Sequence, residues 1–114
     1  GYGHEALASA WGAKIVTREK TEGEQTIKTR DPKGVIHNLG LFFMAFESHT
    51  EQVTKNRKLT RHFDILAASK GCPVEVIQHR KRPLWGVQFH PEKSFPEGRQ
   101  IAENLARIIA KGEP

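Results

Sequence analysis

Short strand-like segments follow one another between residues 13 and 89, and a helical segment stands on either side of them. Each strand-like segment is too short for most helices, is built around apolar or β-branched residues and is bounded by turn residues. Six segments have this character: 13–18, 25–29, 41–46, 63–68, 74–79 and 84–89. The order of helix, about six strands and helix predicts an α/β domain whose helices cover a sheet.

Two helices and three connections complete the expected layout. Residues 4–11 contain helix formers and stop at Gly12, a typical helix end. The last helix shows a single apolar stripe at helical spacing, with Pro96 before it and Gly112 after it; the stripe is formed by Ile101, Leu105, Ile108 and Ile109. We expect a turn at 21–24, a fully buried strand at 41–46, and a polar loop at 47–61.

Composition limits the class of protein. The chain has 114 residues, of which 37% are hydrophobic, which is enough for one domain. No apolar run approaches the roughly 20 residues of a membrane helix, and the first residues do not resemble a signal peptide. The single cysteine, Cys72, excludes an internal disulfide framework and a multi-cysteine zinc site. We expect a cytoplasmic protein without a metal ion or a cofactor.

Basic residues gather in two segments, 55–62 and 79–82, in a chain with a formal net charge of +5. Neither segment is interleaved with aromatic residues, as a platform for stacking nucleic-acid bases would be. Two interpretations stay open for them: solvated loops, or a docking surface for a partner protein or a nucleotide-binding domain. A basic nucleic-acid-binding module is a further alternative, and it predicts binding that weakens steeply with salt.

The sharpest local motif is Gly-Val-Gln-Phe-His-Pro-Glu at 86–92. A strand ends at His90, Pro91 stiffens the following turn, and Glu92 stands two residues after the histidine. A histidine oriented by a carboxylate is the arrangement of a general base, because the carboxylate fixes the tautomer and stabilises the imidazolium. The alternative is an ordinary histidine at a strand end.

Two weaker motifs lie elsewhere in the chain. Residues 1–5, Gly-Tyr-Gly-His-Glu, lead into the first helix, and glycines at such a turn allow the tight bend of a nucleophile elbow. Residues 47–50, Glu-Ser-His-Thr, directly follow the apolar run 41–46, where a loop at a strand end is a common place for a site. Each motif by itself is weak.

Together, the three motifs resemble the class I, triad-type glutamine amidotransferases in order and spacing over essentially the whole chain. Residues 63–69 and 72–75 resemble most closely the amidotransferase part of GMP synthases. The resemblance implies a flavodoxin-like α/β fold with mixed parallel and antiparallel strands. It further implies that residues 1–114 are a single partial domain, which lacks the N-terminal half of the family fold.

The resemblance also assigns roles to residues of this sequence. It implies that His90 is the base, that Glu92 orients it, and that the backbone N–H of Tyr2 stabilises the oxyanion. Gly1 stands where the family has its nucleophilic cysteine, and Cys72, which precedes a strand, is no substitute. The substrate glutamine would be bound by Glu5 and by Ser48, His49 and Thr50, the last three largely through backbone groups.

These roles imply a protein that hydrolyses glutamine and passes ammonia to a synthetase domain or subunit. Without a thiol at Gly1, we expect this chain alone to be inactive, and we expect its incomplete face to favour self-association. The basic segments 55–62 and 79–82 are candidates for contact with the synthetase. A non-catalytic homologue that binds glutamine or regulates a partner remains an alternative.

Overall fold

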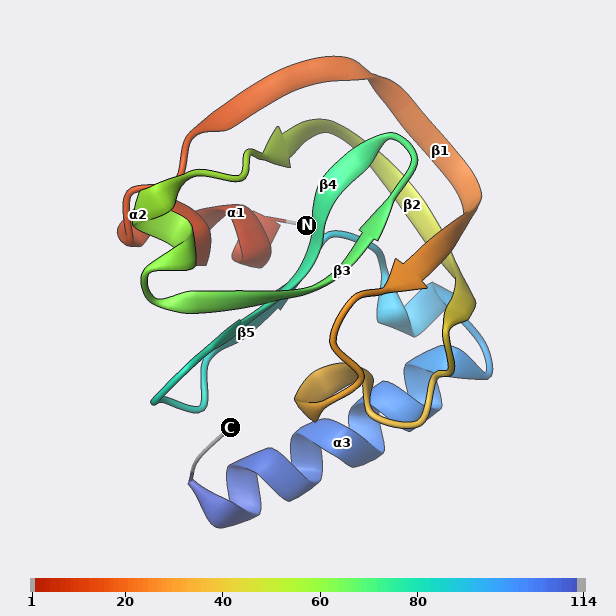
Figure 1. The fold of residues 1–114 in the computed structure, drawn as a ribbon. Coiled ribbons are helices and arrows are strands. Elements are labelled where there is room, and N and C mark those ends of the chain that lie inside the picture. Colours follow the sequence, from red (N-terminus) through yellow and green to blue (C-terminus); the bar gives the residue numbers. More distant parts are fainter. Residues whose placement is uncertain (1, 113–114) are drawn as a thin grey trace.

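A computed structural model describes residues 2–112 as one curled sheet with helices packed against it (Figure 1). The elements, in chain order, are α1 (Tyr2–Ala10), β1 (Ile15–Thr29), the 3-10 helix η1 (Gly34–Ile36), β2 (Phe42–Val53), α2 (Arg57–Thr60), β3 (Phe63–Ser69), β4 (Cys72–His79), β5 (Trp85–Val87), the 3-10 helix η2 (Pro91–Lys93) and α3 (Glu97–Lys111). The predicted α/β class and both predicted helices are confirmed. No helix within residues 2–112 combines the length and the apolar content that crossing a membrane requires.

The five strands lie in the order β2-β1-β3-β4-β5, and every pairing among the described residues is antiparallel. The expected parallel component is therefore wrong for this part of the chain. The reason lies in the connections, because parallel neighbours need a crossover of a dozen or more residues. Strands β3 and β4 are joined by residues 70–71 alone, which permits only a hairpin.

The two strands and the turn expected between residues 13 and 29 form one long strand, β1. Gly23 has a φ of +103°, yet it stays in register opposite Glu47 on β2. Between Thr17 and Thr21 the pairing with β2 is irregular, and this bulge absorbs extra residues of β1. The glycine therefore bends the strand and does not reverse it.

The loop expected at 47–61 is wrong for its first half, because β2 continues to Val53. The apolar run is also only half buried: Phe43 and Ala45 face the core, while Phe42 and Met44 are exposed. This alternation is that of a strand with one face toward solvent. The polar half of β2, residues 47–53, is held in the sheet by backbone pairing with β1. The apolar content of a segment does not predict this pairing.

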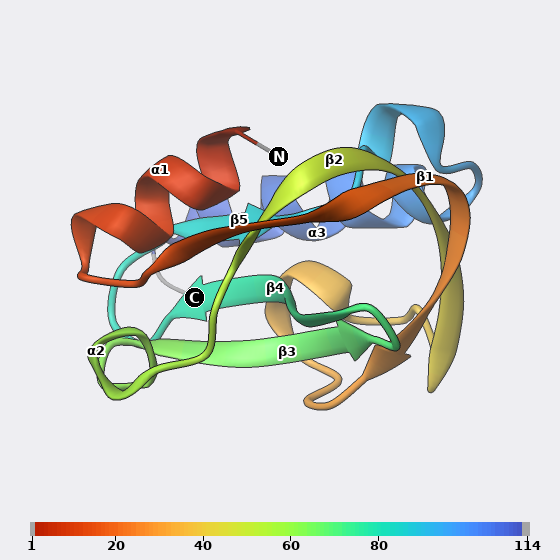
Figure 2. The same cartoon turned by 90° about the horizontal axis from the view of Figure 1, so that it is seen from above.

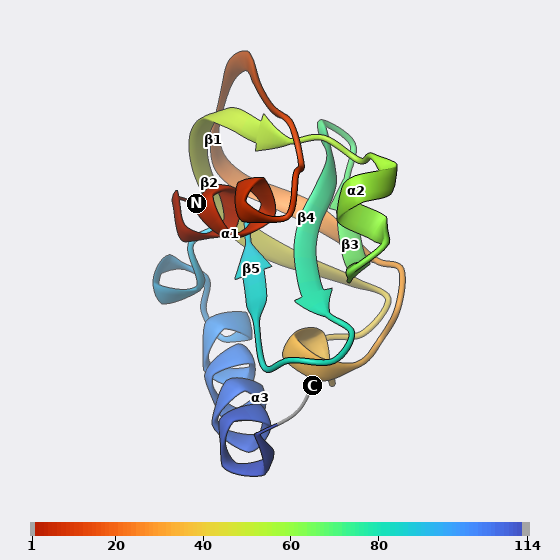
Figure 3. The ribbon, with the colours of Figure 1, turned by 90° about the vertical axis from the view of Figure 1, so that its left-hand side faces the viewer.

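Two clusters of buried apolar side chains fill the molecule. One joins the sheet to α3 and η1, and the other joins it to α1 and α2. Figures 1 and 3 show these two groups of helices at separate places against the sheet. Within the predicted stripe of α3, Ile109 is 63% exposed, and Asn104 is buried in its stead. The Asn104 amide donates hydrogen bonds to the carbonyls of Val35 (2.9 Å) and His37 (2.7 Å), so it fastens α3 to η1.

The sheet curls until the chain after β5 reaches β2, although three strands separate them in the hydrogen-bonded order (Figure 2). The backbone N–H of His90 donates to the carbonyl of Phe46 on β2 at 2.8 Å. The same curl brings Glu47 of β2 beside Glu75 of β4. Strand β2 therefore contacts both the motif at 86–92 and, through Glu47, the buried Glu75 of β4.

Candidate active site

The turn after β5 is pinned in place by a serine. The Ser94 hydroxyl donates to the carbonyl of His90 at 2.7 Å and accepts from the N–H of Phe46 at 2.9 Å. At the start of α3, an added Cβ on Gly98 would lie 1.9 Å from the Pro91 carbonyl oxygen, so only glycine allows this approach. The backbone of the turn is therefore fixed from both sides.

Within this turn, the imidazole of His90 lies against the carboxylate of Glu92, with Nδ1 and Oε2 3.1 Å apart. When Nδ1 carries the proton and donates to Glu92, Nε2 is left free to accept one. The His90 side chain is 33% exposed, which leaves it within reach of a reactant. The backbone N–H of Glu92 itself, and then His90, hold the pKa of the Glu92 carboxyl below its usual range. The turn thus has the geometry of an oriented base, and its catalytic role stays a prediction.

Helix α1 presents two further residues of the predicted site. Tyr2 begins the helix with its side chain 87% exposed, so a role in the site would fall to its backbone. Glu5 lies within hydrogen-bonding reach of Gln88 and Glu51, and burial, followed by the charge of Glu51, raises the pKa of its carboxyl. Gln88 is fully buried and stands two residues before His90, which places Glu5 near the turn that carries His90. Gly1 lies outside the described residues.

The contact between α1 and β5 is unusually close at Gly86. An added Cβ there would lie 2.7 Å from Nδ1 and 3.0 Å from Cα of His4. His4 is buried, and its Nε2 is 3.2 Å from the carbonyl of Val74. Burial lowers the pKa of His4 to about 3, so the ring is neutral at physiological pH. His4 therefore acts as a packed, neutral side chain beneath the helix.

The three other predicted glutamine-binding residues lie on strand β2 and do not share one face. The Ser48 hydroxyl donates to Glu22 on β1 at 3.2 Å in an exposed position, and Thr50 is exposed as well. His49 points to the opposite face, where its buried imidazole Nε2 contacts a carboxylate oxygen of Glu47. The His49 side chain is thus already engaged, so glutamine could meet this segment only through the backbone or the outer face.

The residues that sequence reasoning missed form a buried polar cluster around Glu47 and Glu75. Both carboxyl groups are fully buried beside each other, and the Ser69 hydroxyl donates to Glu75 at 2.6 Å. Burial, followed by Glu47, raises the pKa of Glu75 to about 9. Glu75 therefore keeps its proton at neutral pH and donates it to Glu47, which also contacts His49. The only indication of this cluster in the sequence is that Glu75 interrupts an apolar run at 74–77 and that Glu47 directly follows the apolar run at 41–46.

Cys72 lies beside this cluster as a buried free thiol. Its Sγ is 3.4 Å from the carbonyl of Val74. Burial, followed by the charge of Glu75, raises the pKa of the thiol to about 12. Because the thiolate is the reactive form, Cys72 is a poor nucleophile, in agreement with the expectation that it does not replace the family's nucleophile.

The two basic segments predicted to lie in loops come together on one surface. The N–H of Arg80 donates to the carbonyl of His62 at 3.0 Å, and the rings of His62 and His79 stack with their centroids 6.2 Å apart. Residues 57–60 form helix α2, which Asn56 caps by accepting from the N–H of Leu59. We refer to residues 55–62 and 79–82 together as the basic loop surface.

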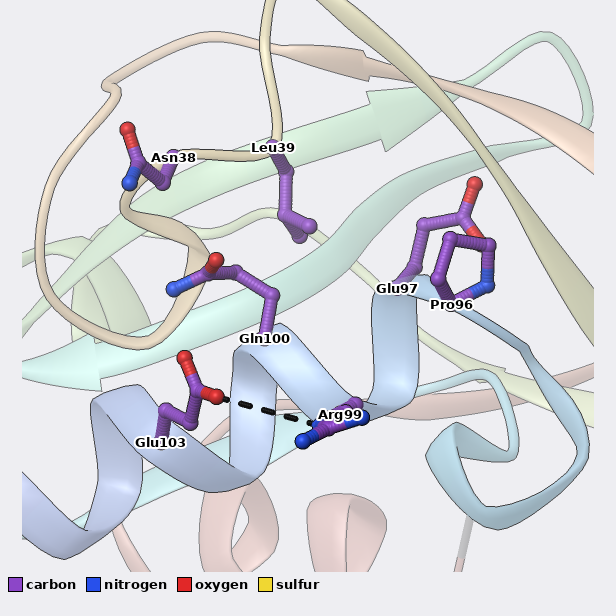
Figure 4. Close-up of a pocket in the computed structure, with 7 residues that line it drawn as sticks. All are labelled: Asn38, Leu39, Pro96, Glu97, Arg99, Gln100 and Glu103. Atoms are coloured by element: carbon purple, nitrogen blue, oxygen red, sulfur yellow. Dashed lines mark ion pairs between the residues drawn. The ribbon is translucent and has the colours of Figure 1, made fainter.

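A pocket of about 370 Å³ lies between the segment before β2 and the start of α3 (Figure 4). Its one cation, Arg99, faces Glu103 at 3.9 Å, and Glu97 adds a second carboxylate. None of the predicted site residues lines it. Within residues 2–112, no group of three or more histidine, cysteine or acidic side chains could hold a metal ion.

Comparison with known proteins assigns the chain to a family. A model of the class-I glutamine amidotransferases matches residues 1–108. The glutamine-hydrolysing GMP synthase subunit of Methanothermobacter thermautotrophicus is 35% identical over 105 residues, which is 90% of this chain and 55% of that protein. The corresponding GMP synthase subunit of Pyrococcus furiosus is 36% identical over 111 residues, which is 96% of this chain and 57% of its relative.

Solved structures show the same fold. A proposed GMP synthase subunit from Thermoplasma acidophilum superposes with a TM-score of 0.87 at 25% identity, covering 95% of this chain and 54% of that one. A glutamine amidotransferase from Thermotoga maritima, at 16% identity, has a TM-score of 0.65 and shares the fold over 91% of this chain and 51% of its own. The chain therefore belongs to the class-I glutamine amidotransferase family, and it spans about half the length of the curated relatives that it matches.

Proposed function

We propose that this chain is the part of a glutamine amidotransferase that supplies the base of the catalytic triad, and that it belongs to the GMP synthase type. The observation that carries the proposal is the contact between His90 Nδ1 and Glu92 Oε2 at 3.1 Å, in a turn fixed against β2. The relatives with about 35% identity are named as glutamine-hydrolysing GMP synthase subunits, which supports this assignment.

The proposed reaction needs a thiol that is deprotonated beside His90. His90 would take the thiol proton through Nε2, and the sulfur would attack the side-chain amide carbon of glutamine. The backbone N–H of Tyr2 would stabilise the oxyanion, and His90 would return the proton to the departing ammonia. Water would then hydrolyse the thioester to glutamate. Glu92 would hold the imidazole in the required tautomer throughout.

Gly1 occupies the position at which the resemblance places the nucleophile, so we propose that the chain does not hydrolyse glutamine by itself. Cys72 supports this proposal, because its buried thiol has a pKa of about 12 and is therefore unreactive at neutral pH. The glycine at position 1 also favours a second candidate function. A homologue with a glycine there could bind glutamine without turnover and regulate a synthetase.

We further propose that the basic loop surface contacts the synthetase partner. Its exposed cations include Arg57 and Lys58 on α2, next to the turn after β4. Reversal of both charges to glutamate should weaken binding to that partner by about tenfold or more. Unchanged partner binding in this double variant would reject the docking role and leave the amidotransferase proposal untouched.

The central experiment restores the thiol in the longest polypeptide encoded around these residues. Gly1→Cys should release ammonia from glutamine, whereas the unchanged protein should not, and Gly1→Cys/His90→Ala should lose the gained activity by at least about 10³-fold. A matched control, Gly1→Cys/His37→Ala, changes a histidine outside the proposed site and should keep it. Glutamine binding by calorimetry without ammonia release from the Gly1→Cys variant would favour the regulatory homologue.

A further inference from the structure

A second concave pocket, of about 480 Å³, shares no lining residue with the proposed catalytic turn. Three of its lining residues are basic, namely Arg30, Lys55 and Lys70. The apolar part of its lining comes from Ile65, Ala68 and Pro73, and no acidic side chain lines it. We refer to it as the basic pocket, and of its cations only Lys55 also belongs to the basic loop surface. Its volume lies within the range of about 300–1,000 Å³ that small-molecule sites occupy.

The three cations come from segments far apart in sequence that the fold holds together. The N–H of Arg30 donates to the carbonyl of Leu66 on β3 at 2.7 Å, which fixes the end of β1. The Gln52 amide donates to the carbonyl of Gly71 at 2.8 Å, which ties β2 to the turn that carries Lys70. Lys55 follows Thr54, whose N–H donates to the carbonyl of Lys14 at 2.9 Å. The backbone beneath each cation is therefore anchored to the sheet.

The charge of these cations is not compensated locally. Within residues 2–112, no ion pair involves Arg30, Lys55 or Lys70, and all three side chains are exposed. Elsewhere the fold does neutralise neighbouring cations: Asp64 pairs with Lys33 at 2.7 Å and with Arg80 at 3.1 Å. Like charges around one hollow focus a positive potential into it, which attracts an anion.

We propose that the basic pocket binds a small, multiply charged anion of the phosphate class, either a phosphate ester or a polyphosphate. The guanidinium group of an arginine and two lysine ammonium groups can donate hydrogen bonds to phosphate oxygen atoms. An anion must carry several negative charges to pair with all three cations. The apolar lining around Ala68 suits the organic body of an ester. The proposal is independent of glutamine hydrolysis, so its failure would leave the proposed function unaffected.

The test uses inorganic tripolyphosphate as the probe and calorimetry at low salt as the measurement. The variant Arg30→Gln/Lys55→Gln/Lys70→Gln removes the three cations of the pocket. The control Arg61→Gln/Lys81→Gln/Arg82→Gln removes three exposed cations of the basic loop surface and changes the net charge equally. The pocket variant should bind at least about tenfold more weakly than the unchanged protein, and the control less than about threefold. All six side chains are exposed, and the melting temperature of each variant verifies that it is folded.

Three results would overturn the proposal. Absence of binding by the unchanged protein at millimolar tripolyphosphate would show that the cations are merely solvated. Equal weakening in both triple variants would assign the binding to the overall charge of the protein and not to the pocket. Binding of polyglutamate with no binding of tripolyphosphate would assign the surface to an acidic protein segment. If a triple variant fails to fold, the single variants Arg30→Gln and Lys70→Gln, compared with Lys81→Gln, decide the same question.

Discussion

The turn at His90 and the cluster at Glu47 each join a histidine to a carboxylate, but in opposite surroundings. The His90 side chain is one-third exposed and the Glu92 side chain nearly two-thirds, whereas His49 and Glu47 are buried inside the curled sheet. The first pair comes from neighbouring positions in one turn. The second is completed by Glu75 and Ser69, which other strands bring to it.

The difference in surroundings shifts the pKa values of the carboxyl groups in opposite directions. The pKa of Glu92 is lowered by its own backbone N–H and by His90, so Glu92 is an anion that can stabilise an imidazolium. The pKa of Glu75 is raised to about 9 by burial and by Glu47, so Glu75 is a neutral donor at physiological pH. An accessible pair can serve a reaction, whereas a buried pair with a retained proton serves to join strands β2 and β4.

The largest expected effect comes from breaking the buried cluster. Glu75→Ala should lower the free energy of unfolding by about 3–5 kcal/mol, because it leaves Ser69 and the buried carboxylate of Glu47 without their partner and opens a cavity. Denaturation by urea at pH 7 measures it. Glu92→Ala is the matched control in the exposed pair and should change the same quantity by less than about 1 kcal/mol. Equal losses in both variants would remove the distinction between the two pairs.

A second effect is expected on the buried side of the motif at 86–92. Gly86→Ala should cost about 2 kcal/mol, because its Cβ would lie 2.7 Å from Nδ1 and 3.0 Å from Cα of His4 and push α1 away from β5. Gly71→Ala is the control, since an added Cβ there meets nothing within 4 Å. Thermal unfolding of both variants measures the effect. A melting temperature of Gly86→Ala equal to that of the unchanged protein would contradict the close packing of α1 against β5.

The third prediction concerns the dependence of stability on pH. The native state keeps the proton of Glu75 up to about pH 9, whereas the unfolded chain releases it near the ordinary value of 4.5. The stability from this group is complete below pH 4.5 and is lost as pH rises through about 9. His4 acts in the opposite direction: its native pKa of about 3 lowers stability only as pH falls below 6.5. Between pH 6.5 and 8 the slope therefore belongs to Glu75, because the raised pKa of Cys72 lowers stability only at higher pH, where an unfolded thiol ionises.

Urea denaturation between pH 6.5 and 8 should show the free energy of unfolding falling by about 2 kcal/mol with rising pH. Glu75→Gln retains a hydrogen-bond donor but cannot ionise, so it should flatten the profile in this window. Glu103→Gln, at an exposed position on α3, should leave the profile unchanged. The same slope in the unchanged protein and in Glu75→Gln would show that Glu75 does not carry the retained proton.

The two pairs also show how far the sequence predicts this molecule. The contact of His90 with Glu92 was predictable because both residues lie in one turn whose conformation Pro91 restricts. The helix at residues 97–111 was predictable from its apolar period, although the burial of Asn104 depends on carbonyls of η1 more than 60 residues away. Local patterns thus predict elements and contacts within one turn.

Other features depend on distant partners and left no local pattern. The polar residues 47–53 form a strand because β1 pairs with them, and the same pairing keeps the bent segment around Gly23 in one strand. Glu47 and Glu75 come together only because the sheet curls. The inward direction of His49 follows from the register of β2, and a shift by one residue would have turned it to solvent.

The smallest effect is expected for Glu92→Gln, and it separates orientation from stability. The free energy of unfolding should change by less than about 0.5 kcal/mol, because the contact with His90 is exposed to solvent. The amide can no longer attract the Nδ1 proton as strongly, so ¹⁵N shifts of the His90 ring should show a larger share of the Nε2–H tautomer. Glu97→Gln, at the start of α3, should leave those shifts unchanged. If the tautomer populations stay the same in Glu92→Gln, then Glu92 does not orient His90, and the accessible pair would lose the one property that distinguishes it from an ordinary histidine at a strand end.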